Sequence, residues 1–460
     1  MLVSLLLYLT SLGTPAAPPD STVIVRSVRI DGNHRTRERI IRREMELRPG
    51  DTIRVGQLAE KLAWDGRKIS NTNLFITVDV AAVPADSQRI DVEVKLKERM
   101  FLFAFPTFFL ADRNFSEWWY ERNRDLRRTI YGGRMYYKNV TGNNDRLRAI
   151  LEFGFLTRAD LTYTLPYIDR AQKTGISVGA SYITNKEIAW RSAGDKLVYL
   201  RDERLLRDRF AAGVVLTRRN QFYTFHRAEL RYSRTNVADT IARLNPDYFL
   251  GGRTRQRYFH LGYSYIYDRR DNVAYPLKGY QLELNADRFG LLPTDDLQQT
   301  ELQGSLSRFV PLSRRWYFST MVSGKLSWPE RQPYFNLRGL GYLNDFVRGY
   351  ELYVIDGQRY GLVKNTFRFQ VLNIRKTFKW IPVRQFSTVP LAIYLTAYGD
   401  AGYVHSSLAK RYESRFANRW LGGTGLGLDV VTFYNAVFQF NYAVNGRGET
   451  GFYFTYLYDL

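Results

Sequence analysis

Apolar and polar side chains alternate at every second position in much of the chain after Met100. In Phe259–Tyr267 the odd positions are apolar or aromatic, and the same period recurs in Trp316–Trp328 and Tyr434–Val444. An extended strand places successive side chains on opposite faces, so each segment has one apolar wall and one polar wall. A soluble antiparallel sandwich has the same period, and alternation alone does not choose between the two folds.

The length of this region and its polar second wall favour a membrane barrel. Residues 101–460 divide into about 16 strands at roughly 22 residues for a strand with its connection, an even number in the range of outer-membrane barrels. Aromatic residues make up 15% of the chain, an excess that aromatic girdles at the two membrane interfaces explain. We therefore predict a mainly β protein in which residues 101–460 form a transmembrane antiparallel β-barrel of about 16 strands.

Residues 21–100 have the mixed periodicities of a small α/β domain with the order β-α-α-β-β. Thr36 is a candidate N-cap for the first helix, and Gly32-Asn33 supplies the turn that precedes it. The predicted elements are strand Thr22–Ile30, helix Arg37–Leu47, a second helix with Val55, Leu58, Leu62 and Ile69 on its inner face, and strands Phe75–Val83 and Arg89–Lys97.

The first twenty residues have the pattern of an export signal. Leu2–Leu12 is an apolar run followed by the small residues Ala16 and Ala17, like the hydrophobic region and cleavage zone of a signal peptide. No Lys or Arg precedes Arg26, which departs from the usual positively charged start. The run is too short to span a bilayer as a helix. We predict a signal peptide over residues 1–20.

The net charge and the absence of cysteine exclude several classes of function. The net charge is +22 and there is no cysteine, so disulfides and thiolate metal sites are excluded. Most of the basic excess is spread thinly along the aromatic region after Met100, without a compact basic block. We therefore predict no nucleic-acid partner, and expect the surplus in the interior and rims of the barrel, where it meets lipid-headgroup phosphates.

Signals for catalysis are weak throughout. Gly446–Gly451 matches the dinucleotide pattern G-x-G-x-x-G, but a helix must follow such a site and only one aromatic strand remains, so we interpret the segment as a hairpin turn. The four histidines, at positions 34, 226, 260 and 405, have no metal-ligand spacing. We predict that the protein is not an enzyme and has neither a cofactor nor a metal site.

Several segments resemble one known family. Residues 21–100, with the turn at Gly32 and Asn33, resemble a POTRA domain. The other segments are Asp112–Trp119, a barrel motif made of Asp268, Arg270, Asp271, Pro276 and Gly279, and Phe346–Tyr350. Together they resemble the BamA/TamA outer-membrane assembly family, also called bacterial surface antigens, and this chain is similar to a short member with a single POTRA domain.

The resemblance implies a contact between a loop and the barrel wall. In the family, a Val-Arg-Gly-Tyr segment lies at the tip of a long extracellular loop that folds back into the barrel, where its arginine binds acidic groups. Here the segment supplies Arg348, Gly349 and Tyr350, and the downstream family motif places Asp400 as the partner. The family often has a Glu where this chain has Thr366, so the second acidic contact departs from the pattern.

The resemblance also gives a role to the C-terminal strand. Its alternate residues share one face, and the family uses such a strand as the signal for its own insertion. Many members end in an aromatic residue, whereas this chain ends in leucine. The residues of that face are Phe452, Phe454, Tyr456, Tyr458 and Leu460.

The function that the resemblance implies is assembly of other β-barrel proteins in the outer membrane of a Gram-negative bacterium, with the POTRA domain in the periplasm. The POTRA edge would capture an unfolded outer-membrane protein, and the seam between the first and last barrel strands would template its insertion. The implied partners are these clients, accessory lipoproteins or periplasmic chaperones, the lipid bilayer and lipopolysaccharide. A two-partner-type secretion pore, and a structural or channel barrel that scaffolds another envelope complex, remain alternatives.

Overall fold

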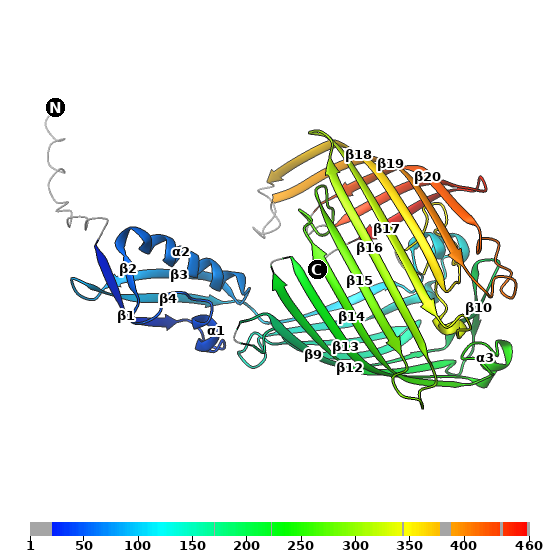
Figure 1. Ribbon diagram of the computed structural model, residues 1–460, viewed down its shortest axis with the longest axis horizontal. Helices are drawn as coiled ribbons and strands as arrows, with labels where there is room; N and C mark the ends of the chain where they lie inside the picture. The colour runs from blue at the N-terminus through cyan, green and yellow to red at the C-terminus, as the bar shows by residue number, and fades with distance from the viewer. Residues whose placement is uncertain are drawn as a thin grey trace. The chain divides into compact units, whose positions relative to one another are not determined.

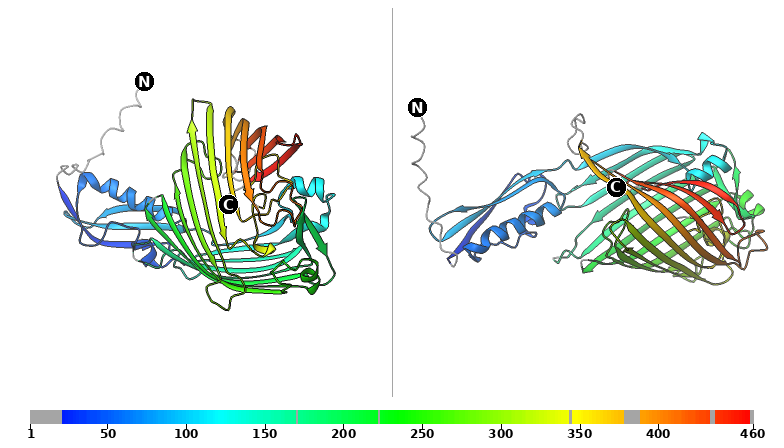
Figure 2. Two further views of the ribbon diagram at one scale, coloured as in Figure 1. Left: turned by 45° about the vertical axis from the view of Figure 1, so that its right-hand side comes forward. Right: turned by 90° about the horizontal axis from the view of Figure 1, so that it is seen from above.

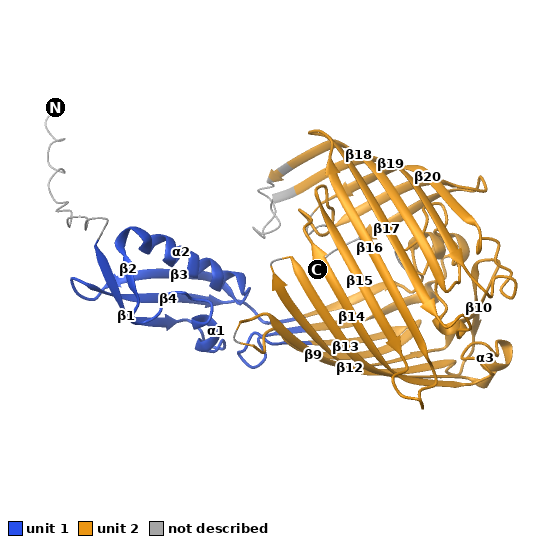
Figure 3. Ribbon diagram, viewed as in Figure 1, with its two compact units in different colours: residues 1–103, 136–147 blue, residues 104–135, 148–460 orange. Residues whose placement is uncertain are grey.

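The computed structural model describes residues 21–169, 171–221, 223–342, 345–377, 388–432 and 436–457. Its chain divides into two compact units, one made of residues 1–103 and 136–147 and the other of residues 104–135 and 148–460 (Figure 3). The predicted signal peptide, Tyr458 and Leu460 lie outside the described residues. Among the described residues, no helix is long and apolar enough to cross a membrane.

The first unit contains a four-stranded sheet with the strand order β2-β1-β4-β3, in which β1 and β4 are parallel. Buried side chains of the strands and both helices form one core, including Val25, Ile41, Ile69 and Val92. The POTRA-like fold is confirmed, and a three-residue strand is added between the two helices. The elements are β1 (Thr22–Asp31), α1 (Glu38–Arg42), β2 (Thr52–Arg54), α2 (Val55–Asn71), β3 (Phe75–Pro84) and β4 (Arg89–Glu98).

The predicted first helix, Arg37–Leu47, is wrong in its length, because α1 ends at Arg42. The carboxylate of Asp65, on α2, accepts hydrogen bonds from the backbone amides of Glu46 at 2.7 Å and Leu47 at 3.1 Å. In a continuous helix these amides would bind carbonyls of the preceding turn. A buried side chain distant in sequence therefore draws the segment out of the helix.

The turn before α1 also differs in detail from the prediction. Thr36 is not the N-cap: that position is Arg37, without a capping side chain, and the Thr36 hydroxyl instead accepts a hydrogen bond of 2.8 Å from Asn139. Gly32 has φ +90°, and a side chain there would overlap a carbonyl of β4. Only glycine fits this position without strain. Asn33 donates from its side chain to the Thr36 carbonyl at 2.9 Å.

The barrel is an antiparallel sheet of 16 strands in the order β22-β21-β20-β19-β18-β17-β16-β15-β14-β13-β12-β9-β8-β7-β6-β5. Figures 1 and 2 show the strands of the second unit tilted and curved around an interior. The mainly β fold with about 16 strands is confirmed. The strands of this sheet are β5 (Leu102–Leu110), β6 (Thr129–Lys138), β7 (Arg146–Gly154), β8 (Leu156–Leu165), β9 (Thr174–Asn185), β12 (Arg207–Gln221), β13 (Thr224–Val237), β14 (Arg255–Asp268), β15 (Gly279–Phe289), β16 (Gln299–Pro311), β17 (Trp316–Trp328), β18 (Arg359–Thr377), β19 (Thr388–His405), β20 (Trp420–Val431), β21 (Val437–Asn445) and β22 (Thr450–Leu457).

The alternation in the sequence separates the two walls of this sheet. On β17, Val322 and Leu326 are exposed while Ser323, Lys325 and Ser327 are buried. An apolar outer wall over a polar inner wall is the arrangement of an outer-membrane barrel. The exposed aromatics of the barrel strands, such as Tyr263 and Trp316, are thus surface residues of the outer wall rather than a core.

The connections alternate between the two ends of the sheet. We call the end at which β5 begins the near end and the opposite one the far end. The β14–β15 connection, residues 269–278, is at the near end, and the long β17–β18 connection, residues 329–358, is at the far end. Smaller elements among the connections are the π-helix Glu117–Glu121, the 3-10 turns Leu126–Arg128 and Tyr334–Asn336, the hairpin β10 (Glu187–Ala193) and β11 (Lys196–Arg201), and α3 (Asp239–Leu244).

Candidate functional site: a far-end loop held against the inner wall

The 329–358 loop is attached to the inner wall by a buried ion pair. Arg348 donates from Nε to Asp400 Oδ2 at 2.7 Å and from Nη2 to Oδ1 at 2.5 Å, and its backbone amide donates to Oδ2 at 3.1 Å. Asp400 lies on β19, and its side chain is fully buried. The Arg348 guanidinium also stacks 3.9 Å above the centre of the Tyr398 ring. Bidentate pairing with stacking on an aromatic ring is what a guanidinium does and an ammonium does not.

The second acidic contact of the family pattern is replaced by a backbone carbonyl. Arg348 donates from Nη2 to the carbonyl oxygen of Asn365, on β18, at 3.1 Å. Thr366, at the position where the family often has Glu, is buried on the inner face. The guanidinium therefore donates hydrogen bonds to one carboxylate and one backbone carbonyl. Its single positive charge is paired with the single negative charge of Asp400.

Glycines on the inner wall let the loop lie directly on the strands. A side chain at Gly423, on β20, would overlap the carbonyl oxygen of Arg348, and one at Gly402 would crowd the side chain of Val347. Gly349 has φ +96°, a conformation that favours glycine. The loop and the inner wall can therefore approach closely because each has glycine at the contact.

Glu351 is a buried acidic group beside the ion pair. Its Oε2 accepts a hydrogen bond of 2.7 Å from the backbone amide of Gly349. Burial raises the pKa of Glu351 to about 7, and the hydrogen bond from Gly349 opposes that shift. The neighbouring Tyr350 is buried against Phe416 of the β19–β20 connection, with ring centroids 5.1 Å apart. Sequence reasoning missed Glu351 because its burial depends on packing from distant strands.

The segment after β5 attaches to the same loop. Arg113 donates to the carbonyl oxygens of Gly341 and Tyr353, and Asn114 donates to that of Glu351 at 3.0 Å. Phe115 packs edge-to-face on Phe454 of β22, with ring centroids 5.9 Å apart. Residues near the two ends of the barrel sequence and the 329–358 loop therefore form one connected set of contacts.

The barrel motif at residues 268–279 forms the near-end turn between β14 and β15. Asp268 pairs with Arg270 at 2.7 Å. Asp271 Oδ1 instead accepts from the backbone amides of Leu277 at 3.0 Å and Lys278 at 3.1 Å. Pro276 lies inside the turn, and Gly279, with φ +106°, begins β15. This motif contacts a different part of the inner wall from Arg348.

The near-end turn reaches strands that are distant from it in the sheet. The Tyr275 hydroxyl donates to Asp429 Oδ2, on β20, at 2.8 Å, and its ring packs 4.9 Å from that of Tyr394 on β19. In the strand order, β14 and β15 are separated from these strands by β16, β17 and β18. The sequence predicts the turn but not this contact, because no motif near Tyr275 or near Asp429 indicates that the two residues pair.

The described part of the C-terminal strand has its aromatic face outward. Phe452 and Tyr456 are exposed, while Tyr453, of opposite parity, is buried. Phe438 of β21 stacks on Tyr456 with ring centroids 4.9 Å apart. Gly446–Gly451 spans the β21–β22 turn and the start of β22. Among the described residues, no cluster of three or more His, Asp or Glu side chains could hold a metal ion.

Comparison with known families identifies both units. A family model described as the Omp85 superfamily domain matches residues 139–366, and a POTRA model, described as a surface antigen variable number repeat, matches residues 23–99. The chain belongs to the Omp85 superfamily. Within it, the sequence is similar to the outer membrane protein assembly factor BamA of Nitratidesulfovibrio vulgaris, with 31% identity over 78 residues. That match spans 17% of this chain and only 9% of the relative.

Two solved structures share the fold of this Omp85 chain. BamA from Haemophilus ducreyi lacking POTRA domains 1–3 superposes with a TM-score of 0.66 and 15% identity, covering 94% of this chain and 84% of that one. CdiB from Escherichia coli superposes with a TM-score of 0.55 and 12% identity, covering 94% and 76% of the two chains. At such identities the likeness concerns the fold alone, and both neighbours share it with this chain.

Proposed function

We propose that this Omp85 protein inserts other β-barrel proteins into the outer membrane of a Gram-negative bacterium, with clients folding at the edges of its sheet. The observation that carries the proposal is the attachment of the 329–358 loop to the inner wall. A passenger that crossed the interior would have to displace this loop. A client that folds at an edge strand leaves it in place.

The free energy needed to displace the 329–358 loop favours clients that fold at an edge strand over a passenger that crosses the interior. Separating Arg348 from Asp400 would leave a buried carboxylate without its partner, which typically costs about 3–5 kcal/mol. The Tyr275–Asp429 contact holds a second segment in the interior from the near end. Both segments belong to the chain itself, so neither can leave as a separate plug would.

Edge strands of both sheets offer backbone groups for strand addition. The barrel order ends in β5 and β22, and the POTRA sheet ends in the three-residue β2 and the ten-residue β3. An edge strand presents unpaired amides and carbonyls, which pair readily with an extended chain. Ile76, on β3, is 59% exposed and supplies an apolar contact beside the edge. In this proposal β3 captures the unfolded client, and β5 and β22 template its hairpins.

The remaining assignments are part of the same proposal. Residues 1–20 are a signal peptide, residues 21–100 the periplasmic POTRA domain, and residues 101–460 the membrane barrel. Arg348, Gly349, Tyr350 and Asp400 hold the loop and take no part in chemistry, since insertion by strand exchange needs no catalytic residue. The partners are unfolded outer-membrane proteins, with accessory lipoproteins or periplasmic chaperones, in contact with the bilayer and lipopolysaccharide.

Controlled depletion in the native bacterium tests the proposal. The folded fraction of other outer-membrane barrels, measured by heat-modifiable migration in SDS gels, should fall on depletion and recover with the wild-type gene but not with Asp400→Asn. If the folded fraction of other barrels is unchanged on depletion while a single secreted protein is lost, the protein is a secretion pore and the insertion proposal is wrong. Unchanged barrels and unchanged secretion, with ion conductance in planar bilayers, would identify a channel.

A further inference from the structure

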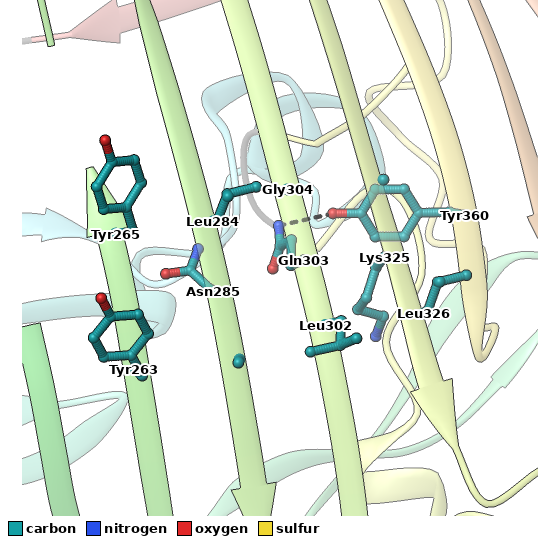
Figure 4. A pocket seen from close by; sticks show the side chains of 12 residues that line it. Tyr263, Tyr265, Leu284, Asn285, Leu302, Gln303, Gly304, Lys325, Leu326 and Tyr360 are labelled. Carbon is teal, nitrogen blue, oxygen red and sulfur yellow. Dashed lines mark hydrogen bonds between the residues drawn. The ribbon is translucent and has the colours of Figure 1, made fainter. Parts of the chain in front are cut away.

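The outer wall of β14–β17 carries a groove that the insertion mechanism does not use. Its volume is about 600 Å³, and its exposed sides include Tyr263, Leu284, Leu302 and Leu326 from four successive strands (Figure 4). Gly304 and Gly324 pair directly across β16 and β17 and leave the floor without side chains. Behind that floor, on the inner wall, Gln303 donates a hydrogen bond of 2.9 Å to the Tyr360 hydroxyl. The groove therefore faces the membrane and is open to an acyl chain.

A cationic site lies at the near end of the same strands. Arg308, on β16, is on the outer face, four residues beyond Gly304 and separated from it by Leu306. The backbone amide of Arg269 donates to the Tyr280 carbonyl at 2.9 Å, and Tyr280 is the register partner of Arg308. This register sets both guanidinium groups at one corner of the wall. At roughly 3.3 Å per residue, the corner is about 13 Å from the groove floor along the strand.

Aromatic groups, not carboxylates, surround this pair of arginines. The Arg269 guanidinium interacts with the hydroxyls of Tyr267 and Tyr280 and lies 5.1 Å from the centre of the Tyr223 ring. In the part of the chain that the structure describes, neither Arg269 nor Arg308 forms an ion pair. Two exposed arginines beside tyrosine hydroxyls offer donors in the geometry that phosphate oxygens accept.

We propose that the outer wall of β14–β17 binds one anionic phospholipid, with its phosphate between Arg269 and Arg308 and one acyl chain in the groove over Gly304 and Gly324. The separation of about 13 Å places the groove within the acyl layer when the phosphate is at the headgroup level. The arginines lie at the end at which β5 begins, so the lipid belongs to the periplasmic leaflet. Phosphatidylglycerol has this chemistry. The site lies near the middle of the strand order, away from the edge strands β5 and β22.

Native mass spectrometry of the full chain in neutral detergent tests the site. With dioleoylphosphatidylglycerol, we expect one lipid retained per protein, at least about tenfold more tightly than dioleoylphosphatidylethanolamine. The double variant Arg269→Gln/Arg308→Gln should lose at least about tenfold in affinity. Gly304→Leu should lose a similar factor by filling the groove, since the nearest atom to its new Cβ is the mobile end of Leu284, at 3.1 Å.

The matched control is Arg314→Gln/Arg315→Gln, which removes two arginines from the near-end turn between β16 and β17, outside the groove. Its phosphatidylglycerol binding should equal that of the wild type, with heat-modifiable migration confirming that every variant is folded. If the control and Arg269→Gln/Arg308→Gln lose equal affinity for phosphatidylglycerol, the lipid binds through the overall positive charge of the near end, and the proposal is overturned. A preference for lipid A over phosphatidylglycerol, or unchanged binding by both site variants, would also overturn it.

Discussion

Two segments enter the interior of this barrel from opposite ends, and they are held in different ways. The far-end loop is fixed by a charged pair, Arg348 with Asp400, on a wall thinned by glycine. The near-end turn is fixed by a tyrosine hydroxyl donating to Asp429 and by packing against Tyr394. Opening the far-end contact separates a buried carboxylate from its guanidinium, whereas opening the near-end contact leaves Asp429 with its hydrogen bond from Gln439 at 3.2 Å. The far-end contact should therefore be nearly permanent, and the near-end contact the easier one to open.

The largest effect should come from Arg348→Ala. The substitution leaves Asp400 buried without a cation, so we expect the free energy of unfolding to fall by about 3–5 kcal/mol. Urea titration followed by heat-modifiable migration measures it. Arg348→Lys is the matched variant: it keeps the charge but loses the bidentate geometry, and should recover only part of the stability. Wild-type stability in Arg348→Ala would mean that the ion pair does not hold the loop.

Gly423→Ala should have the next largest effect, about 3 kcal/mol, because its methyl group would overlap the Arg348 carbonyl oxygen, which is backbone and cannot rotate away. Gly422→Ala, one residue earlier, is the control. Its methyl group meets no atom within 4 Å, and stability and function should be unchanged. Equal behaviour of the two variants in the urea titration would contradict the close contact between loop and wall.

The pH dependence of the far-end loop should follow Glu351. Its pKa is raised to about 7 by burial, so the folded state holds the proton more tightly than the unfolded state. Its contribution to stability is then greatest below about pH 4.5, its ordinary pKa, and declines as the pH rises to about 7, by about 3 kcal/mol in total. Glu351→Gln should remove this part of the pH slope between pH 5 and 8. An identical slope in the variant would exclude Glu351 as its source.

The smallest effect should come from Tyr275→Phe at the near end. The variant keeps the ring packing and loses one hydrogen bond to Asp429, which still accepts from Gln439 at 3.2 Å. We expect a loss of about 1 kcal/mol. Cysteine labelling at Ala274 should become faster in Ala274→Cys/Tyr275→Phe than in Ala274→Cys alone. A loss as large as that of Arg348→Ala would remove the distinction between the two contacts.

The sequence alone predicts the features that repeat or that carry a motif. Alternation at every second position indicated the strands and which of their side chains form the apolar wall and which the polar wall. The Arg348 segment, together with Asp400, indicated the far-end contact. Contacts between distant segments without a shared motif were not predictable. Asp65 shortens the first helix through amides of Glu46 and Leu47, and Asp429 meets Tyr275 from a strand far along the chain. Local propensity contains no information on such partners.

The central claim is that clients fold at the edge of the barrel and do not cross its interior. Photo-crosslinking in living cells tests it most directly, with the crosslinker placed at Phe452 or Tyr456 on the outer face of β22, or at Asn285 on the inner face of β15. We predict that stalled outer-membrane proteins crosslink to both β22 positions and not to Asn285. Crosslinks of a passenger to Asn285 with none at β22 would contradict the claim.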